Sequence, residues 1–322
     1  MSDGRVAVVV GAGICGLSCA LRLLERGWRV EVVADRPSTE STSMVAAAVW
    51  FPTLSGPRER VVRWGRDTFT EFERQARLGV PGVLMRESLT LYRELPGPQW
   101  WAAALDDVRP ARPDELVPGY PHGLRFVVPL VEMRVYLPWL IGEVTCHGGR
   151  FEERRVASLA DASRTADLVV HCSGLGARTL VGDTSVVPVR GQLVRMANPG
   201  LSMSVRDEDH PGGRAYVHPR THDCILGGTF DEGQWDTIPD PRTAAAIVER
   251  CLDIVPALRG AEILGHLVGL RPVRPTVRLE EELAGGGVPR VIHNYGHGGS
   301  GMTLAWGCTD DVAALAGPGT VP

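Results

Sequence analysis

The sequence predicts an α/β protein in two parts, one with a parallel sheet that binds a nucleotide and one with a largely antiparallel sheet. Three observations support this: a strand, glycine turn, helix and strand pattern over residues 6–35; a second strand, glycine turn and helix over 291–307; and strand-like runs grouped between 190 and 283. Strands that alternate with helices form a parallel sheet covered by helices, whereas strands grouped together in the sequence form an antiparallel sheet. The length of 322 residues allows about two domains.

Composition narrows the class of function before any motif is considered. The net charge of -4 gives no basic footprint for nucleic acid. All 34 basic residues are arginine, which is typical of a GC-rich bacterial genome. Without lysine, neither a Walker A loop nor Schiff-base catalysis is possible. The 7 cysteines form no CxxC pair, and no apolar run of membrane length or signal peptide is visible, so we expect a soluble cytoplasmic protein.

Residues 6–35 contain a complete βαβ unit with a glycine-rich turn, Gly11-Ala12-Gly13-Ile14-Cys15-Gly16. Gly11 permits the tight turn, Gly13 lets backbone approach a pyrophosphate, and Gly16 allows close helix–strand packing. The helix N-terminus adds N–H donors and a positive dipole. Asp35 follows about 20 residues later, where an acid binds ribose. The unit predicts a bound dinucleotide and leaves FAD and NAD both open.

The other elements follow from hydrophobic spacing. We expect helices at 57–78, from about 135 and near 243–255, and a strand over 166–171 that ends in another glycine-rich turn. That strand belongs in the nucleotide-binding sheet, which makes the domain discontinuous. The predicted domains are 1–52, 140–190 and 284–322 for the dinucleotide, and 53–139 with 191–283 for the substrate.

Two later segments carry chemical information. Arg271 and Arg274 lie in an extended segment between prolines, and the alternation of a strand predicts that only one of them faces a given pocket. Arginine binds carboxylates with a planar fork. The turn around Gly296–Gly301 opens a helix, as in the first unit, and suits an electron-rich ligand. His293 and His297 are not on a helix, so no metal site is expected.

Seven short segments together match one known family. They are Gly11–Gly16, Ala34–Arg36, Val45–Trp50, Arg190–Gln192, Leu226–Phe230, Arg271–Pro275 and His293–Gly299. In these segments the chain resembles the flavin-dependent D-amino acid oxidases, with D-aspartate oxidases as near relatives. The resemblance covers nearly the whole chain. It implies a Rossmann-like FAD-binding domain with a mostly parallel sheet and a substrate domain with a largely antiparallel sheet.

The resemblance also implies the residues that hold FAD. They are Gly11, Ala12, Gly13, Ile14, Cys15, Gly16, Asp35, Arg36, Ser41, Thr42, Ser43, Ala47, Ala48, Val49, Val156, Ser173, Gly298, Gly299, Ser300, Gly301, Met302 and Thr303. Those implied for the substrate pocket are Phe51, Thr53, Tyr216, Phe230, Arg271 and Ser300.

The implied reaction is the oxidative deamination of a D-amino acid. Arg271 pairs with the substrate α-carboxylate, the Tyr216 hydroxyl contacts the same group, and the Gly299 carbonyl accepts from the α-amine. Hydride passes from Cα to flavin N5 without a general base. The imino acid hydrolyses to a 2-oxo acid and ammonia, and O2 reoxidises the flavin to give hydrogen peroxide. A homodimer is left open.

Four departures from the family pattern concern the substrate. Gly212 replaces a lid tyrosine, and Phe51 and Thr53 replace polar and tyrosyl pocket residues. Phe230 stands where D-aspartate oxidases have an arginine, which disfavours acidic substrates unless Arg214 substitutes for it. We therefore expect neutral D-amino acids as substrates, with basic ones left open. The alternatives are a D-aspartate oxidase, a glycine or sarcosine-type oxidase and, from another class, an NAD-dependent dehydrogenase.

Overall fold

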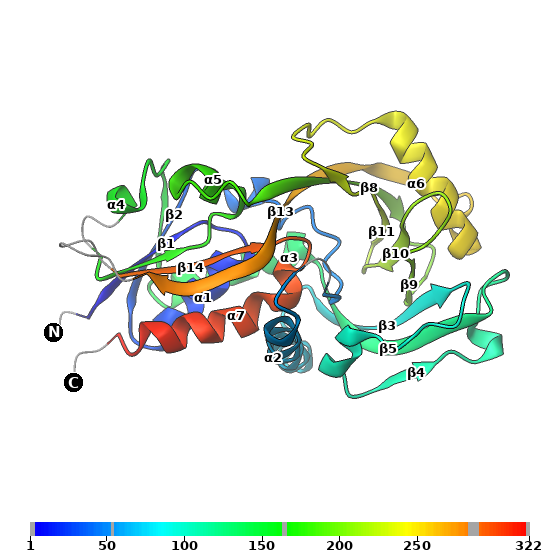
Figure 1. The fold of residues 1–322 in the computed structure, drawn as a ribbon, viewed down its shortest axis with the longest axis horizontal. Helices are drawn as coiled ribbons and strands as arrows, with labels where there is room; N and C mark the ends of the chain where they lie inside the picture. The colour runs from blue at the N-terminus through cyan, green and yellow to red at the C-terminus, as the bar shows by residue number, and fades with distance from the viewer. Residues whose placement is uncertain (1–3, 53–54, 163–165, 283–289, 320–322) are drawn as a thin grey trace.

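The computed structural model describes residues 4–52, 55–162, 166–282 and 290–319. Its strands form one hydrogen-bonded path in the order β4-β5-β3-β9-β10-β11-β8-β13-β14-β7-β1-β2-β6 (Figure 1). One half of this path is parallel, and its central strands over 6–10, 29–34 and 168–171 are rich in valine and mostly buried, as expected for strands covered on both faces. It consists of β1 (Val6–Val10), β2 (Arg29–Ala34), β6 (Arg150–Glu153), β7 (Leu168–His171) and β14 (Arg290–His297).

The other half is mostly antiparallel. Its strands are β3 (Val83–Tyr92), β4 (Val108–Pro110), β5 (His122–Val131), β8 (Val187–Ala197), β9 (Ser204–Asp207), β10 (Ala215–Pro219), β11 (Asp223–Gly227) and β13 (Ile263–Glu282), with β12 (Asp231–Glu232) pairing β8 off the main path. Within it, only β3 and β9 pair in parallel among the described residues. The α/β class with parallel and antiparallel parts is as predicted.

Strand β13 joins the two halves. It is 20 residues long and pairs antiparallel with β8 along one stretch and with β14 along another. The sequence suggested two distinct sheets, whereas the structure connects them through this strand. Hydrogen bonding therefore runs without a break from the nucleotide-type unit to the antiparallel half.

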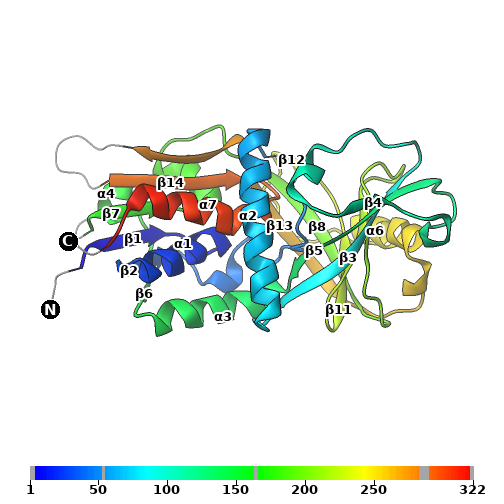
Figure 2. The same cartoon turned by 90° about the horizontal axis from the view of Figure 1, so that it is seen from below.

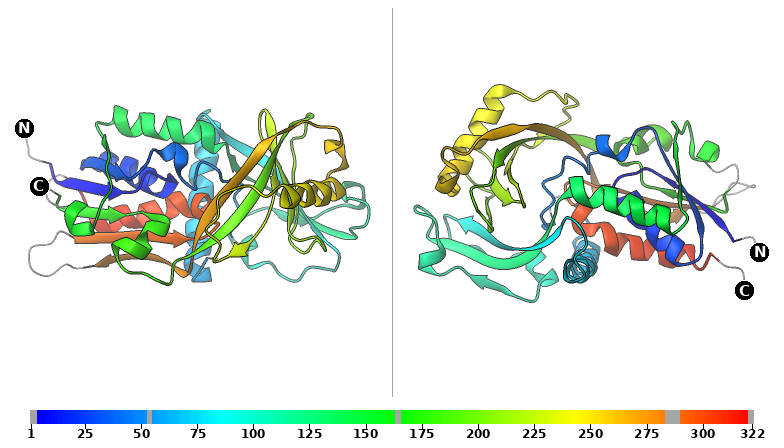
Figure 3. Two further views of the ribbon diagram at one scale, coloured as in Figure 1. Left: turned by 90° about the horizontal axis from the view of Figure 1, so that it is seen from above. Right: turned by 180° about the vertical axis from the view of Figure 1, so that it is seen from behind.

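Helices cover both halves. Helices α1 (Ile14–Glu25) and α7 (Gly301–Ala316) pack together beneath the parallel strands, and α3 (Met133–Cys146) packs against α1. Helix α2 (Arg58–Arg77) packs on α7 and crosses the middle of the molecule (Figure 2). Helix α6 (Pro241–Ile254) covers the antiparallel half at the far end (Figure 3). Short helices are α4 (Leu159–Ala162), α5 (Ala177–Leu180), η1 (Ser38–Glu40), η2 (Trp100–Ala104), η3 (Pro113–Glu115), η4 (Gly174–Gly176) and η5 (Pro256–Leu258).

The crossing of α2 and α7 depends on one glycine. A Cβ added at Gly307 would overlap the backbone of Trp64, and the Gly307 N–H donates to Thr68 Oγ1 at 2.9 Å. Trp64 and Trp306 are fully buried beside this contact and belong to the largest apolar cluster. The close approach fixes α7, and with it the turn that precedes α7. No helix in the described part of the chain is long and apolar enough to cross a membrane.

Candidate functional site

A cavity of about 1090 Å³ lies where the parallel and antiparallel halves meet. The β1–α1 turn, the segment after β2, the end of β7 and the β14–α7 turn line one end of it. Strands β8, β9, β10 and β13 line the other end. Segments far apart in the sequence thus share one elongated space, which is long enough for an extended ligand and a small second molecule.

The turn between β1 and α1 is built from backbone at close approach. Gly11 has φ of +116°, and a Cβ there would lie 2.5 Å from the Cys172 carbonyl oxygen. A Cβ at Gly16 would overlap the Gly11 carbonyl, so Gly16 packs the helix against its own turn. Gly13 stands between them and lines the cavity. Gly11 and Gly16 therefore have the tight-turn and close-packing geometry that the motif predicts, and Gly13 lies at the cavity, where its approach to a pyrophosphate remains a prediction.

Helix α1 presents its N-terminus to the cavity. Ser43 Oγ accepts from the Ile14 N–H at 3.1 Å, which ties the segment after β2 to the helix start. The Asp35 carboxylate lies at the end of β2 beside Arg36, with their closest atoms 3.1 Å apart. The hydrogen bond from Arg36 lowers the pKa of Asp35, so this carboxylate is ionised and can only accept. A helix N-terminus for phosphates and an acceptor for ribose are thus in place.

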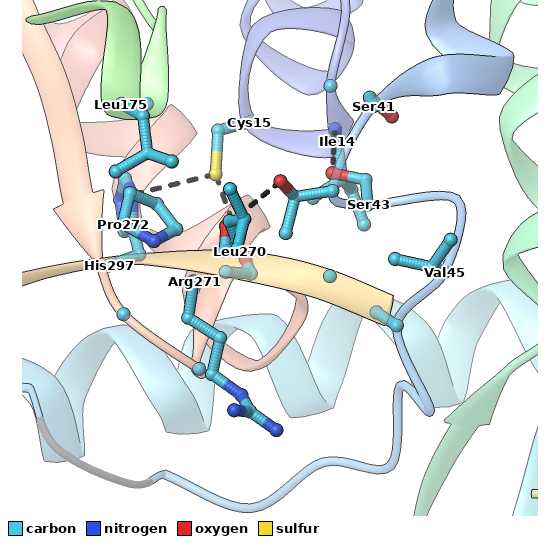
Figure 4. Close-up of a pocket in the computed structure, with 18 of the residues that line it drawn as sticks. Ile14, Cys15, Ser41, Ser43, Val45, Leu175, Leu270, Arg271, Pro272 and His297 are labelled. Atoms are coloured by element: carbon cyan, nitrogen blue, oxygen red, sulfur yellow. Dashed lines mark hydrogen bonds between the residues drawn. The ribbon is translucent and has the colours of Figure 1, made fainter. Parts of the chain in front are cut away.

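Cys15 and His297 meet beside this helix start. Cys15 Sγ lies 3.7 Å from His297 Nδ1 and 3.8 Å from the Gly301 carbonyl oxygen. Burial raises the pKa of the Cys15 thiol, which stays protonated. Burial lowers the pKa of His297 to about 4, and its Nε2 has no partner among the described residues. Figure 4 shows the contact between these two side chains as a dashed line, with the Arg271 guanidinium pointing away from them.

Arg271 projects from β13 into the opposite end of the cavity. A Cβ at Gly191 on the neighbouring strand would overlap its guanidinium, so the glycine provides the space for this side chain. Arg271 Nη1 donates to the Thr229 carbonyl at 3.1 Å, and no described carboxylate pairs with it. Arg274 pairs instead with Asp183 at 2.9 Å and does not line the cavity. The alternation predicted for these two arginines is therefore present.

Tyr216 stands on β10 on the same wall. Its ring lies over Gly227 and Gly228, where an added Cβ would collide with it, and stacks on His218 at 4.7 Å. Burial raises the pKa of Tyr216, so its hydroxyl remains a donor. Two arginines lie over the Phe230 ring: the distance from Cζ to the ring centroid is 4.9 Å for Arg214 and 5.8 Å for Arg271. A small carboxylate in this end would meet donors from several strands.

Arg206 is a further cation of this wall, and sequence reasoning missed it. Arg206 on β9 is the register partner of Tyr216 on β10, and its side chain is buried. Its Cζ lies 3.8 Å from the centroid of the Phe51 ring. Its closest carboxylate is Glu208 at 3.8 Å, and its Nε has no partner in the described part of the chain. No sequence pattern singled out Arg206. What identifies it is its position opposite Tyr216 on the adjacent strand, and this pairing is known only once the fold is known.

The structure brings most of the predicted residues to the cavity. Those that line it are Gly11, Ala12, Gly13, Ile14, Cys15, Asp35, Arg36, Ser41, Thr42, Ser43, Ala47, Ala48, Val49, Phe51, Val156, Ser173, Tyr216, Phe230, Arg271, Gly298, Gly299, Gly301, Met302 and Thr303.

Two of the predicted residues that the structure describes do not line the cavity. Gly16 supports the turn from behind, and Ser300 is fully buried at the start of α7 rather than on the wall. The Ser300 N–H donates to the His297 carbonyl at 2.9 Å within the same turn. Thr53 lies outside the described residues. Arg155, Arg178 and Asn294 line the cavity although the sequence singled out none of them.

The comparisons with known proteins agree with this geometry. The family described as FAD dependent oxidoreductase matches residues 7–315. A D-amino-acid oxidase of Rubrobacter xylanophilus is 52% identical over 98% of this chain and 97% of its own length. Human D-aspartate oxidase is 35% identical over 98% of this chain and 95% of its own. Glycine oxidase from Bacillus cereus superposes with a TM-score of 0.80 at 19% identity, covering 97% of this chain and 94% of that one.

The fold and the site define a flavoprotein oxidoreductase, whose single cavity has a glycine-rich turn at one end and Arg271 at the other. The chain belongs to the FAD-dependent oxidoreductase family. This decides between the two dinucleotides that the glycine motif left open, in favour of FAD. The residues present fit it: Gly11 and Gly13 leave room for a pyrophosphate, and the cavity continues past His297 towards Arg271.

Proposed function

We propose that this enzyme oxidatively deaminates neutral D-amino acids to 2-oxo acids and ammonia, with O2 reduced to hydrogen peroxide. When bound, FAD supplies the two-electron acceptor for the substrate Cα hydrogen. The protein binds and orients the substrate, and no described side chain is assigned as a general base. Two relatives that are 52% and 44% identical, from Rubrobacter xylanophilus and Streptomyces coelicolor, are named D-amino-acid oxidase, which supports this proposal.

The observation that carries the proposal is the state of Arg271. Its guanidinium lies at the cavity with a single hydrogen bond, to Thr229, and with no paired carboxylate among the described residues. An unpaired guanidinium is costly in a partly desolvated pocket. Binding of a ligand carboxylate there is favourable because it supplies the missing anion. The Tyr216 hydroxyl lies on the same wall as a second donor. We therefore assign the substrate α-carboxylate to Arg271 and Tyr216, and the α-amine to the Gly299 carbonyl.

The proposed division of the chain into two domains follows from the strands and turns that line each end of the cavity. The FAD-binding domain is 1–52, 140–190 and 284–322, and the substrate domain is 53–139 with 191–283. The parallel strands β1, β2, β6, β7 and β14 fall in the first set, and β3, β9, β10 and β11 in the second. Strand β13 pairs with β14 of the first set and with β8, which spans the proposed boundary at 190/191, so these strands connect the two domains.

Charge in the substrate end supports the choice of neutral side chains over basic ones. Arg206, Arg214 and Arg271 all line it, whereas Glu208 is the one carboxylate among the lining residues of that wall. Glu208 already lies 3.3 Å from Arg214 and 3.8 Å from Arg206. A lysine-like or arginine-like side chain would meet like charges in a space with few compensating anions.

The same arginines favour a second candidate, the oxidation of D-aspartate. Arg206 is buried without a hydrogen-bond partner in the described structure, so a second substrate carboxylate could pair with it although Phe230 supplies no charge. The similarity to human D-aspartate oxidase is consistent with this candidate. The variant Arg206→Leu separates the two functions: it would remove activity on D-aspartate and leave activity on D-alanine within about threefold.

The test of the proposed function is anaerobic mixing of the yellow holoenzyme with D-alanine, L-alanine and D-aspartate in separate cuvettes. Bleaching of the flavin absorbance by D-alanine alone is the expected result. Bleaching by D-aspartate alone would support the second candidate. Bleaching by glycine or sarcosine, with none by these three, would contradict both and return the assignment to the glycine or sarcosine-type alternative.

A further inference from the structure

A continuous chain of hydrogen-bonded side chains leads from the cofactor end of the cavity to the protein surface. Ser173, which lines the cavity after β7, has Oγ 2.6 Å from His171 Nε2. His171 Nδ1 lies 3.0 Å from His293 Nδ1 on the adjacent strand β14. His293 Nε2 lies 2.9 Å from the Glu282 carboxylate at the end of β13. Neither the two histidines nor Glu282 has a part in the function proposed above.

The surroundings keep both histidines neutral and Glu282 ionised. His171 and His293 are fully buried, and burial together with the mutual contact lowers the pKa of His171 to about 3. Burial also lowers the pKa of His293. Glu282 is 59% exposed and accepts from Arg278 as well, at 3.1 Å. Tyr295 packs against both imidazoles and bonds to Arg278 and Asp183, and Glu280 lies opposite His293 on β13.

These protonation states allow only one donor-to-acceptor direction along the series of hydrogen bonds from Ser173 to Glu282. An ionised Glu282 can only accept, so His293 Nε2 carries the proton and donates to it. A neutral His293 then has an unprotonated Nδ1, which must accept from His171 Nδ1–H. The remaining nitrogen of His171, Nε2, is therefore an acceptor, and Ser173 donates its hydroxyl proton to it. The Ser173 oxygen is left with lone pairs only towards the cavity.

We propose that Glu282, His293 and His171 are positioning residues that fix Ser173 as a hydrogen-bond acceptor at the FAD site. The group that Ser173 meets is then a donor, a ribose or ribityl hydroxyl or an N–H, and not a phosphate oxygen. A surface carboxylate thus sets the polarity of one contact to the cofactor through two buried histidines. The inference rests on the cofactor placement proposed above, in which Ser173 belongs to the FAD site.

The first test needs no variant protein in its main measurement. Nitrogen-15 spectra of histidine-labelled holoenzyme at pH 7 distinguish the tautomers of a neutral imidazole. The expected result is protonated Nδ1 in His171 and protonated Nε2 in His293, with each set of signals assigned by its loss in His171→Phe or His293→Phe. A proton on Nε2 of His171 would reverse the chain and overturn the proposal. The same spectra of apoprotein report the direction even if FAD binds elsewhere.

Glu282→Gln tests the origin of the direction against a matched control. The amide offers both a donor and an acceptor, so we expect two tautomer sets for the histidine pair in this variant. Glu281→Gln is the control, because Glu281 lies next to Glu282 on the same strand but bonds to Arg290, at 2.7 Å, and not to the histidine pair. A single unchanged tautomer set in Glu282→Gln would remove Glu282 from the chain.

A double-mutant cycle on FAD affinity tests whether the histidine acts through Ser173. Quenching of flavin fluorescence on binding to apoprotein gives the dissociation constant. Ser173→Ala and His171→Phe should each weaken binding by about fivefold to tenfold, and the double variant should be no weaker than either. Losses that multiply would show that His171 acts independently of Ser173 and would overturn the proposal. Wild-type apoprotein that binds no FAD would instead contradict the proposed function.

Discussion

The two ends of the cavity are built by different means. At the glycine end, which comprises Gly11, Gly13, Ser43 and Ser173, contacts are offered mainly by backbone at close approach and by a helix N-terminus. At the arginine end, which comprises Arg206, Arg214, Arg271, Tyr216 and Phe230, contacts are offered by long side chains from neighbouring strands. The cofactor end is therefore rigid by covalent geometry, whereas the substrate end depends on packing.

Glycine serves opposite purposes at the two ends. Gly11 has φ of +116° and brings its own backbone to the cavity wall. Gly191 and Gly227 instead make room for the side chains of Arg271 and Tyr216. Family variation in substrate can thus proceed at the arginine end without disturbing the turn that holds the cofactor. The predictions below test this separation, beginning with the largest effect.

Substituting the first glycine of the turn should abolish cofactor binding. In Gly11→Ala the new methyl group would approach the Cys172 carbonyl, at a φ of +116° that L residues rarely adopt. We expect FAD affinity to fall by about 3,000-fold or more, which is loss of measurable binding, as followed by fluorescence quenching on the apoprotein. Gly182→Ala is the matched control, because Gly182 has φ of +65° with open space around it. Equal losses in both variants would contradict a specific role for Gly11.

Removing the substrate cation should leave the glycine end intact. In Arg271→Ala we expect kcat/KM for D-alanine to fall by about 1,000-fold, mainly through KM, because a desolvated carboxylate loses its partner. Flavin absorbance and the dissociation constant of FAD should not change. Arg271→Lys, which keeps the charge but loses the planar fork, should be intermediate. An unchanged KM in Arg271→Ala would remove this residue from the substrate site, and a loss of FAD would show that the two ends are coupled.

The sequence predicts the glycine end well because its determinants are contiguous. Gly11, Gly13 and Gly16 lie within one turn between a strand and a helix, and Gly11 and Gly16 have the geometry that the motif predicts. Local spacing also predicts α2 and the discontinuous nucleotide-type sheet. These features depend on interactions between residues that are close in sequence or in a repeated pattern.

The arginine end was only partly predictable from the sequence. Arg271 and Tyr216 were identified through the family resemblance, since no local pattern brings β13 and β10 together. Arg206 was missed because its importance depends on its register opposite Tyr216 and on stacking with Phe51, which is far away in sequence. Ser300 was assigned to the pocket through the same resemblance, and in the structure it is fully buried at the start of α7.

Lowering the pH should destabilise the protein at both ends of the cavity, because burial lowers the pKa of His297 at the glycine end and of His218 at the arginine end. His297 has a pKa of about 4 in the folded protein because of burial, below its ordinary value of 6.5. Between these two values the unfolded chain binds more protons, so the free energy of unfolding decreases as the pH falls, by up to about 3 kcal/mol from this group. Urea unfolding at pH 7, 5.5 and 4.5 measures this decrease, and His297→Phe should reduce the slope. Equal slopes in both proteins would contradict the assignment.

The smallest effect is expected for Tyr216→Phe. The ring keeps its place over Gly227 and Gly228, and only the hydroxyl contact to the substrate carboxylate is lost while Arg271 remains. We expect kcat/KM for D-alanine to fall by about tenfold or less, with FAD binding unchanged. Because burial raises the pKa of this tyrosine, the loss should be constant from pH 6 to 9. If both residues bind one carboxylate, the double variant with Arg271→Ala should lose less than the product of the single losses. A loss as large as that of Arg271→Ala would mean that Tyr216, and not the arginine, dominates recognition at this end.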